Sequence, residues 1–157
     1  MQKITPFLWF DSQAEEAMNL YLAVFGDGET LDVSRYPERS PGTAGTVMMV
    51  RFRLRDQEFI ALNGGPQFPF TEAVSFVVDC DTQEEVDHFW DRLSEGGEPG
   101  QCGWLKDRFG VSWQIIPKAL GELLGDPDPV KSQRVMTAML AMRKLDIEAL
   151  WKAANGG

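Results

Sequence analysis

Few side chains in this sequence could do chemistry, and they stand apart from one another. The only histidine, His88, is off the apolar stripe of a segment with helical periodicity, so we expect it to face solvent. Cys102 lies close to Lys106 and Arg108, and two nearby positive charges would favour a thiol nucleophile there. Because no histidine base is available to Cys102 or Ser112, we favour a structural role for both and assign no catalytic residue.

The composition is that of one small, acidic globular domain. The chain has 157 residues, 43% of them hydrophobic, and 24 acidic residues against 15 basic ones give a net charge of -9. That charge repels phosphate backbones and anionic lipids, so we predict no nucleic-acid or membrane partner. No apolar run reaches the roughly 20 residues of a membrane-spanning helix, and the first residues lack a signal-peptide pattern. The two cysteines, Cys80 and Cys102, form no C-x-x-C pair, so we expect reduced thiols and a cytoplasmic protein.

Two segments far apart in the chain each begin with a helix-capping pattern. Residues 12–15 read Ser-Gln-Ala-Glu and residues 82–85 read Thr-Gln-Glu-Glu, and both fit the capping box. Apolar residues then recur at helical spacing until Gly26 and Gly96 end the two patterns. We therefore predict two helices with Ser12 and Thr82 as their N-caps.

Short runs of aromatic and β-branched residues surround these helices and predict strands. One run precedes each helix, at residues 4–10 and 74–80, and three candidate strands follow each one. Those after the first helix are residues 30–36, 46–55 and 58–63, and those after the second are residues 100–104, 105–109 and 111–116. The sequence thus predicts an α+β fold with two β-α-β-β-β modules, residues 1–66 and 71–117, within a single domain of residues 1–157.

The last segment, residues 118–157, is predicted to be a helical extension. Asp128 precedes Pro129, a pairing typical of a helix start, so we expect a helix over residues 130–142 and a shorter one after Asp146. From residue 130 on there are five basic and two acidic residues, so this tail either docks on an acidic surface or presents a solvated face. Its stripe of methionine and leucine fits packed core, including a dimer interface, or a recognition surface.

The longest specific motif is residues 101–117, which read QCGWLKDRFGVSWQIIP. Together with ITPFLWFD at residues 4–11 and ALNGGP at residues 61–66, it resembles the PhnB-like proteins of the vicinal oxygen chelate superfamily. This group of the glyoxalase, bleomycin resistance and dioxygenase superfamily is often labelled 3-demethylubiquinone-9 3-methyltransferase-like. The ending around residues 142–147 also resembles the group. The resemblance implies a curved mixed sheet built from both modules, and a homodimer.

In metal-using members of this superfamily, the first and last strands of each module contribute His or Glu ligands. Here the corresponding places are residues 4–6, Ala61, residues 73–74 and Gln114. No His, Asp or Glu occurs among residues 1–10, and a divalent ion needs several donors, some of them charged. We therefore predict no metal site of that type and no bound cofactor.

The methyltransferase label would require a different kind of site. Common S-adenosylmethionine sites use a glycine-rich turn between the first strand and its helix. Here that turn contains Asp11 and Ser12 and no glycine, while the G-x-x-G-x-x-G spacing at Gly97, Gly100 and Gly103 follows a helix instead of a strand. The sequence predicts no such site.

A small-molecule pocket is the remaining interpretation. Strand alternation groups Gln114 with Ser112, and Ala61 with Phe59 and Asn63. The resemblance implies that these faces line the cup of the sheet, where aromatic side chains would form its walls. The predicted ligand-binding residues are Phe7, Trp9, Phe59, Asn63, Trp104 and Gln114. An arginine ladder at positions 51, 53 and 55 is a rival anion site if it faces the cup, or else a solvated strand edge.

Three functions fit these observations. The leading hypothesis is a homodimeric protein that binds a small apolar or aromatic molecule in the cup without a metal. The first alternative is an enzyme with an unrecognised metal or cofactor, either of the glyoxalase and dioxygenase type or a methyltransferase as the label implies. The second alternative is an interaction protein that acts through its basic C-terminal tail.

Overall fold

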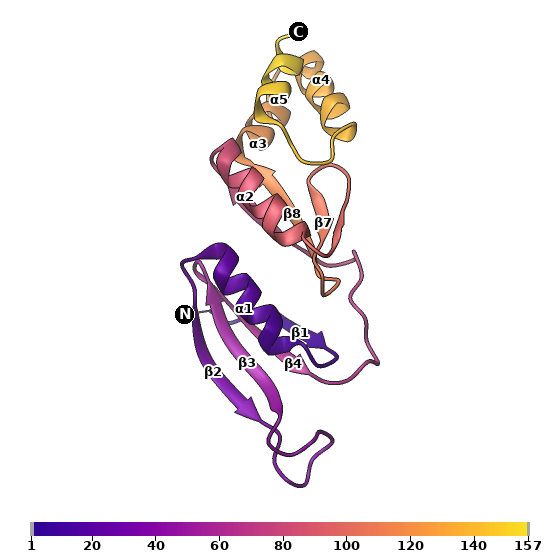
Figure 1. The fold of residues 1–157 in the computed structure, drawn as a ribbon. Coiled ribbons are helices and arrows are strands. Elements are labelled where there is room, and N and C mark those ends of the chain that lie inside the picture. The colour runs from indigo at the N-terminus through magenta and orange to yellow at the C-terminus, as the bar shows by residue number, and fades with distance from the viewer. Residues whose placement is uncertain (1, 157) are drawn as a thin grey trace. The chain divides into compact units, whose positions relative to one another are not determined.

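The computed structural model describes residues 2–156, and the chain divides into two compact units, residues 1–70 and 71–157 (Figure 1). Each unit contains one four-stranded sheet with a helix packed against one of its faces. The predicted α+β class and the pair of β-α-β-β-β modules are confirmed. Among residues 2–156, no helix has the length and apolar character needed to span a bilayer.

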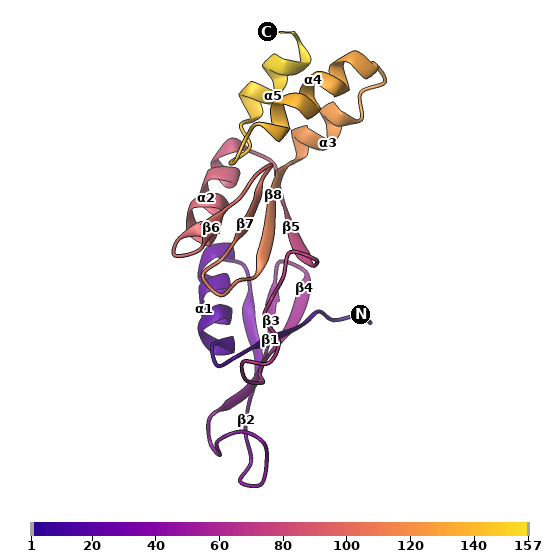
Figure 2. The same cartoon turned by 90° about the vertical axis from the view of Figure 1, so that its right-hand side faces the viewer.

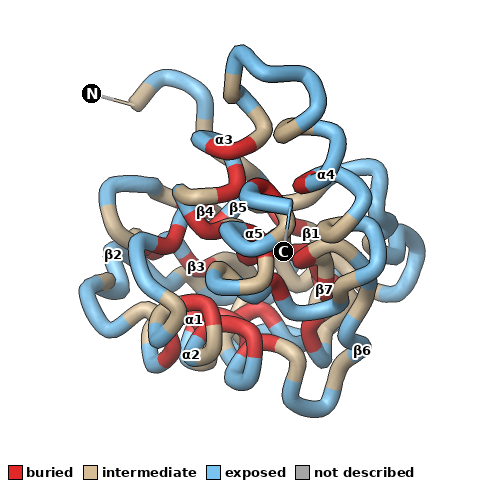
Figure 3. Tube along the Cα trace, turned by 90° about the horizontal axis from the view of Figure 1, so that it is seen from above, coloured by how far each residue is buried: buried red, intermediate tan, exposed pale blue. Residues whose placement is uncertain are grey.

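The first unit is built from β1 (Phe7–Phe10), α1 (Ala14–Phe25), β2 (Glu29–Arg35), β3 (Val47–Leu54) and β4 (Gln57–Asn63). Its sheet has the order β1-β4-β3-β2, with β1 parallel to β4 and the other pairs antiparallel. Tyr21 of α1 packs against Phe52, and Phe52 stacks on Phe59 of the neighbouring strand. These aromatic side chains form the core of the unit on the α1 side of the sheet, where buried positions recur along the trace (Figure 3).

The second unit repeats the arrangement. Its elements are β5 (Ser75–Cys80), α2 (Gln83–Ser94), β6 (Glu98–Pro99), β7 (Trp104–Lys106) and β8 (Ser112–Pro117), in the sheet order β5-β8-β7-β6. β5 is parallel to β8, whereas β7 is antiparallel to it. α2 covers the face that carries the buried Val78, Trp113 and Ile115. Because side chains alternate along a strand, Gln114 lies on the opposite face.

One predicted strand is wrong. Residues 100–104 mostly form a turn, and the strand expected there is the two-residue β6 that precedes it. Cys102 and Gly103 both have positive φ values, 58° and 85°, which are incompatible with an extended strand.

The C-terminal extension forms α3 (Lys118–Leu124), α4 (Pro129–Leu140) and α5 (Ile147–Ala154), which pack together within the second unit (Figure 2). The predicted helix starts at Asp128 and Asp146 are confirmed, because each side chain caps its helix. The buried core of the extension contains Leu120, Leu123, Val135, Leu145, Leu150 and Ala154. The turn before β7 joins the extension through its backbone, since the Cys102 and Gly103 amides donate to the carbonyls of Met142 and Arg143, both at 2.8 Å.

The two predicted capping boxes differ in outcome. Thr82 is confirmed as the N-cap of α2, where its hydroxyl accepts a hydrogen bond from the Glu85 amide at 3.2 Å. The prediction for Ser12 is wrong, because α1 begins at Ala14 and its own segment provides no side-chain cap. The Ala14 amide instead donates to Oδ1 of Asn63, at the end of β4, at 2.7 Å. Asn63 is 49 residues away, so only the tertiary structure brings this cap into place.

We expect Asn63→Ala to lower the free energy of unfolding by about 1–2 kcal/mol. The substitution removes the cap of α1 and the hydrogen bond that Asn63 Nδ2 donates to the Val47 carbonyl. Ser12→Ala is the matched control, and its exposed position predicts a change within about 0.5 kcal/mol. Urea denaturation measures both values, and equal effects of the two substitutions would contradict the assignment of the cap to Asn63.

Candidate functional site

Gln114 and Trp104 lie on the face of the second sheet opposite α2, which we call the far face. Gln114 is flanked by Val77 of β5 and Trp104 of β7. Its Nε2 donates to Oγ of Ser75 at 2.9 Å, which fixes the orientation of the amide. Val77 is 54% exposed although it is a large apolar side chain within a sheet. A fixed amide among apolar and aromatic surface suits a small ligand with a hydrogen-bonding group.

The same far face continues to a charged end at Lys106. Lys106 lies opposite Ser112 in the sheet, and its Nζ is 2.5 Å from Oε1 of Glu72. The Lys106 ammonium lowers the pKa of the Glu72 carboxyl, first through the hydrogen bond and then through its charge, and Glu72 raises the pKa of Lys106 by the same two effects. Together with Trp104 and Pro99, these residues line a depression of about 190 Å³.

The first sheet has its own far face, opposite α1, and Phe7 and Trp9 lie there. Phe7 is 51% exposed. Trp9 is held in place, because its Nε1 donates to the Gly65 carbonyl at 2.9 Å and its ring packs edge-on against Phe68. A Cβ at Gly64 would lie 2.4 Å from the indole ring, so this packing requires glycine at that position.

The prediction that Phe59 and Asn63 line a ligand cup is wrong in its choice of face, since both lie on the α1 side of the first sheet. Phe59 is 5% exposed and stacks on Phe52. The Asn63 side chain caps α1, and its carbonyl accepts a hydrogen bond from the Tyr36 hydroxyl. Asn63 also borders a depression of about 650 Å³ near the start of α1. Alternation grouped these residues correctly, but the group occupies the opposite face.

The arginine ladder is occupied by internal contacts. Arg51 Nη1 lies 3.3 Å from Glu58 Oε2, and Arg53 Nη2 lies 3.6 Å from Glu29 Oε1. The third arginine, at position 55, leaves the strand at the hairpin turn with φ 51°, and its guanidinium carbon lies 5.8 Å from the centre of the Phe25 ring. The strand register places Arg51 and Arg53 on the face of the sheet opposite the buried Phe52, and two ion pairs and a cation–π contact engage the three charges. The rival anion site stays a prediction.

A buried carboxylate organises the motif at residues 101–117, and sequence reasoning gave it no role. Asp107 is 3% exposed. Its Oδ1 accepts from the Phe109 and Val111 amides at 2.9 and 3.1 Å, and its Oδ2 accepts from Nε1 of Trp113 at 2.9 Å. These three charge-assisted bonds set the hairpin between β7 and β8, and the hairpin positions the residues of the far face.

The residues considered as nucleophile or base have structural surroundings. Cys102 anchors the extension through its amide, and His88 is exposed on α2 as predicted, with its ring beside Phe89. Within residues 2–156, no three His, Cys, Asp or Glu side chains gather in a group that could hold a metal ion. On the far faces, the strand positions nearest to the superfamily's ligand places hold Phe7, Ile60 and Leu62 on either side of Ala61, Ser75, and Gln114 itself. One hydroxyl and one amide, both neutral, do not fit the donor set of a divalent ion.

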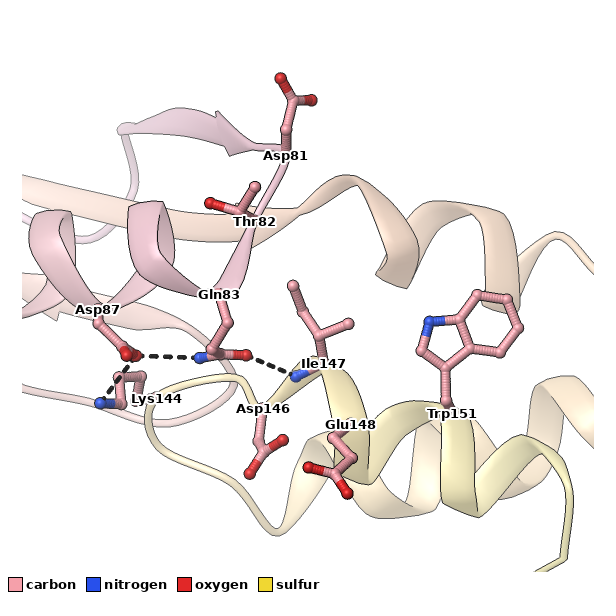
Figure 4. A pocket seen from close by; sticks show the side chains of 9 residues that line it. All are labelled: Asp81, Thr82, Gln83, Asp87, Lys144, Asp146, Ile147, Glu148 and Trp151. Carbon is pink, nitrogen blue, oxygen red and sulfur yellow. Dashed lines mark hydrogen bonds and ion pairs between the residues drawn. The ribbon is translucent and has the colours of Figure 1, made fainter.

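A further depression, of about 810 Å³, lies between the start of α2 and α5 and has no counterpart in the sequence predictions (Figure 4). Gln83 joins both sides, because its Nε2 donates to Asp87 Oδ1 and to the Leu145 carbonyl, and its Oε1 accepts from the Ile147 amide at 2.8 Å. Lys144 Nζ lies 3.0 Å from Asp87 Oδ1. The Gln83 hydrogen bond, followed by the Lys144 contact, lowers the pKa of Asp87. These polar groups hold the extension against α2, over sequence separations of more than 60 residues that no local motif reveals.

Comparison with known families matches residues 2–116 to the family described as 3-demethylubiquinone-9 3-methyltransferase. The chain belongs to this family. It is similar to a PhnB protein from Bacillus cereus, with 41% identity, 74% of this chain and 99% of that one covered, and a TM-score of 0.67. Two further solved structures share the fold. One is a protein from Pseudomonas aeruginosa, with 23% identity, 74% of this chain and 98% of that one covered, and a TM-score of 0.62. The other is the fosfomycin resistance protein FosX from Mesorhizobium loti, with 13% identity, 80% of this chain and 98% of that one covered, and a TM-score of 0.55. A search of curated proteins finds no match.

The family match and the Bacillus cereus protein confirm the PhnB-like assignment. The likeness to FosX shows the fold that is expected for the vicinal oxygen chelate superfamily. The family match ends at residue 116, so the extension, including the expected likeness of residues 142–147, lies outside it. The methyltransferase of the family description implies a methyl donor such as S-adenosylmethionine. The turn after β1 has no glycine, and the Ala14 amide at the start of α1 is already bonded to Asn63, so these residues do not fit a helix-start site for that cofactor.

We expect Asp107→Asn to lower the free energy of unfolding by about 2–3 kcal/mol. An amide nitrogen in place of one carboxylate oxygen would face a donor, either the Trp113 indole N–H or the backbone amides. Asp56→Asn, at the exposed hairpin turn of the other module, is the control and should leave stability unchanged within about 0.5 kcal/mol. Chemical denaturation measures the free energy of unfolding of both variants. If Asp107→Asn left it unchanged, the role given to this carboxylate would be refuted.

We expect Lys106→Met to raise the pKa of Glu72 toward its ordinary value, because the ammonium that favours the carboxylate is removed. In the unsubstituted protein the pair stabilises the fold above the unfolded pKa of Glu72, and this contribution is lost as the pH falls through the lowered folded pKa. Side-chain carboxyl NMR across a pH titration measures the change. Lys144→Met is the control, since it should raise the pKa of Asp87 and leave the pKa of Glu72 unchanged.

Proposed function

We propose that this PhnB-like protein binds a small, largely apolar or aromatic molecule against the far face of its second sheet. Gln114 would orient the ligand by hydrogen bonding, and Trp104 would pack against it. The observation that carries the proposal is Val77, which is 54% exposed directly beside the fixed amide. Apolar surface left exposed next to a convergent polar group is typical of a binding surface.

Phe7 and Trp9 on the far face of the first sheet offer a second surface of the same chemistry. We propose that they also contact ligand, that the functional form is a metal-free homodimer, and that it acts in the cytoplasm. The exposure of Phe7 and Val77 supports an apolar surface that a ligand or a second subunit covers. Both Cys80 and Cys102 are thiols, which is compatible with a reducing compartment.

Native mass spectrometry of freshly purified protein tests the assembly and the metal. We expect twice the mass of the 17.6 kDa chain, with an organic adduct and without a divalent ion. One divalent ion per subunit would contradict the metal-free proposal, and a monomer would contradict the dimer. The mass of an adduct would also begin to identify the natural ligand.

An NMR titration with indole, a neutral aromatic probe, tests the site itself. We expect shifts at the Gln114 side-chain amide and the Trp104 indole, and an affinity about fivefold lower in Gln114→Ala, for the loss of one hydrogen bond of about 1 kcal/mol. Gln133→Ala, which removes an exposed amide on α4, is the matched control. Equal affinity of the two variants would show that Gln114 is not in the site.

A further inference from the structure

The depression at the charged end of the far face contains a buried hydroxyl without a partner. Ser112 is 1% exposed, and within residues 2–156 its Oγ has no hydrogen-bond partner. A buried hydroxyl left unpaired costs free energy, about 1–3 kcal/mol, so it calls for an explanation in a folded protein. Ser112 lines the depression of about 190 Å³ that Lys106 and Glu72 border. A ligand that enters this depression therefore meets a hydroxyl able to donate to it.

The cation beside Ser112 already holds a carboxylate, and this carboxylate is replaceable. Glu72 lies in a turn before β5, outside the sheet, and its side chain is 59% exposed. Lys106, in contrast, is fixed in β7 opposite Ser112. The glutamate thus occupies Lys106 as a tethered anion that can swing into solvent at small cost, since exposed ion pairs contribute little to stability.

Strand geometry sets the distance between the charge and the aromatic surface. Trp104 and Lys106 are two residues apart on β7, so they share the far face and are separated by about 7 Å. Across the strand pair, Ser112 lies opposite Lys106 and Gln114 lies opposite Trp104. An anion at Lys106 and a ring at Trp104 would therefore belong to one compact molecule. The depression is smaller than the roughly 300–1,000 Å³ of sites for drug-sized ligands, which also favours a single ring.

The charge balance favours a monoanion over a dianion. Lys106 is paired with Glu72, and the charge of Glu98, opposite it on β6, also acts on Lys106. One ammonium between two carboxylates would bind a phosphate dianion poorly, because Glu98 remains after Glu72 is displaced. The carboxylate of a monoanionic ligand can take the place of the Glu72 carboxylate at Lys106, so the number of negative charges in contact with the ammonium stays the same.

We propose that the far face binds a small aromatic carboxylic acid, whose carboxylate displaces Glu72 from Lys106 and accepts a hydrogen bond from Ser112 while its ring packs on Trp104. This inference rests on the proposed function and specifies its ligand class. Glu72 then acts as an internal competitor that keeps the site closed to weakly bound anions. No covalent step is involved, and no metal or cofactor is required.

Phenylacetate and its neutral analogue phenylacetamide test the proposal in NMR titrations of the full chain. We expect phenylacetate to bind at least fivefold more tightly than phenylacetamide, with shifts at Ser112, Lys106 and Trp104. Glu72→Gln removes the competitor and should tighten phenylacetate binding about fivefold without changing the affinity for phenylacetamide. Lys106→Met should weaken phenylacetate binding at least tenfold, and Ser112→Ala should weaken it several-fold.

The ion pair between Lys144 and Asp87 is the matched control, because it also joins a lysine to a carboxylate in the same unit at similar exposure. Asp87→Asn and Lys144→Met should leave both affinities unchanged. Equal binding of the two probes, or no effect of Glu72→Gln on phenylacetate, overturns the carboxylate site, and indole binding through Gln114 would then leave the proposed function intact. If indole and both of these probes fail to bind, the two proposals are wrong together.

Discussion

The packing of one helix against one face of each sheet decides which residues of this protein remain for function. α1 and α2 each bury a stripe of apolar side chains, and the strands turn every second residue toward that stripe. In the second unit, Trp113 and Ile115 are buried on the α2 side of the sheet, so Ser112 and Gln114 lie on the far face. The far faces are thus the complement of the two cores. Any ligand chemistry on the sheets uses the side chains that the helices do not.

The motif at residues 101–117 shows how one stretch of sequence serves both sides. Leu105, Asp107 and Trp113 are buried and fix the hairpin, while Trp104 and Lys106 point to the far face. The Asp107 carboxylate connects the two sets. It directly follows β7, and its three donors lie in the turn, at Phe109 and Val111, and in β8, at Trp113. A long, specific motif in this family therefore reflects folding constraints as much as binding chemistry.

Sequence reasoning could predict the elements and the repeat, because hydrophobic period, capping residues and glycine stops are local signals. It could not choose the face in β4, where both alternating sets are apolar: Phe59 and Ala61 on one side, Ile60 and Leu62 on the other. In β8 the polar Ser112 and Gln114 fall on one face, which made the choice easier. The hydrogen bonds of Asn63 to α1 and of Gln83 to the extension could not be predicted, because their partners lie 49 and 64 residues away and no local pattern records them. The positive φ values at Cys102 and Gly103 likewise turned an apparent strand into a turn.

The attachment of the C-terminal extension has an evolutionary implication. At the turn before β7, the bonds to Met142 and Arg143 join backbone to backbone, so changes of side chain at these two tail positions leave the acceptors in place. On the donor side, Gly103 has φ 85°, and a Cβ there would lie 2.9 Å from the Ile115 carbonyl oxygen, so this position requires glycine. The tail can therefore drift widely in sequence while keeping its anchorage here. A relative that ends near residue 116 would lack the two acceptor carbonyls, so water would have to satisfy these two amides instead.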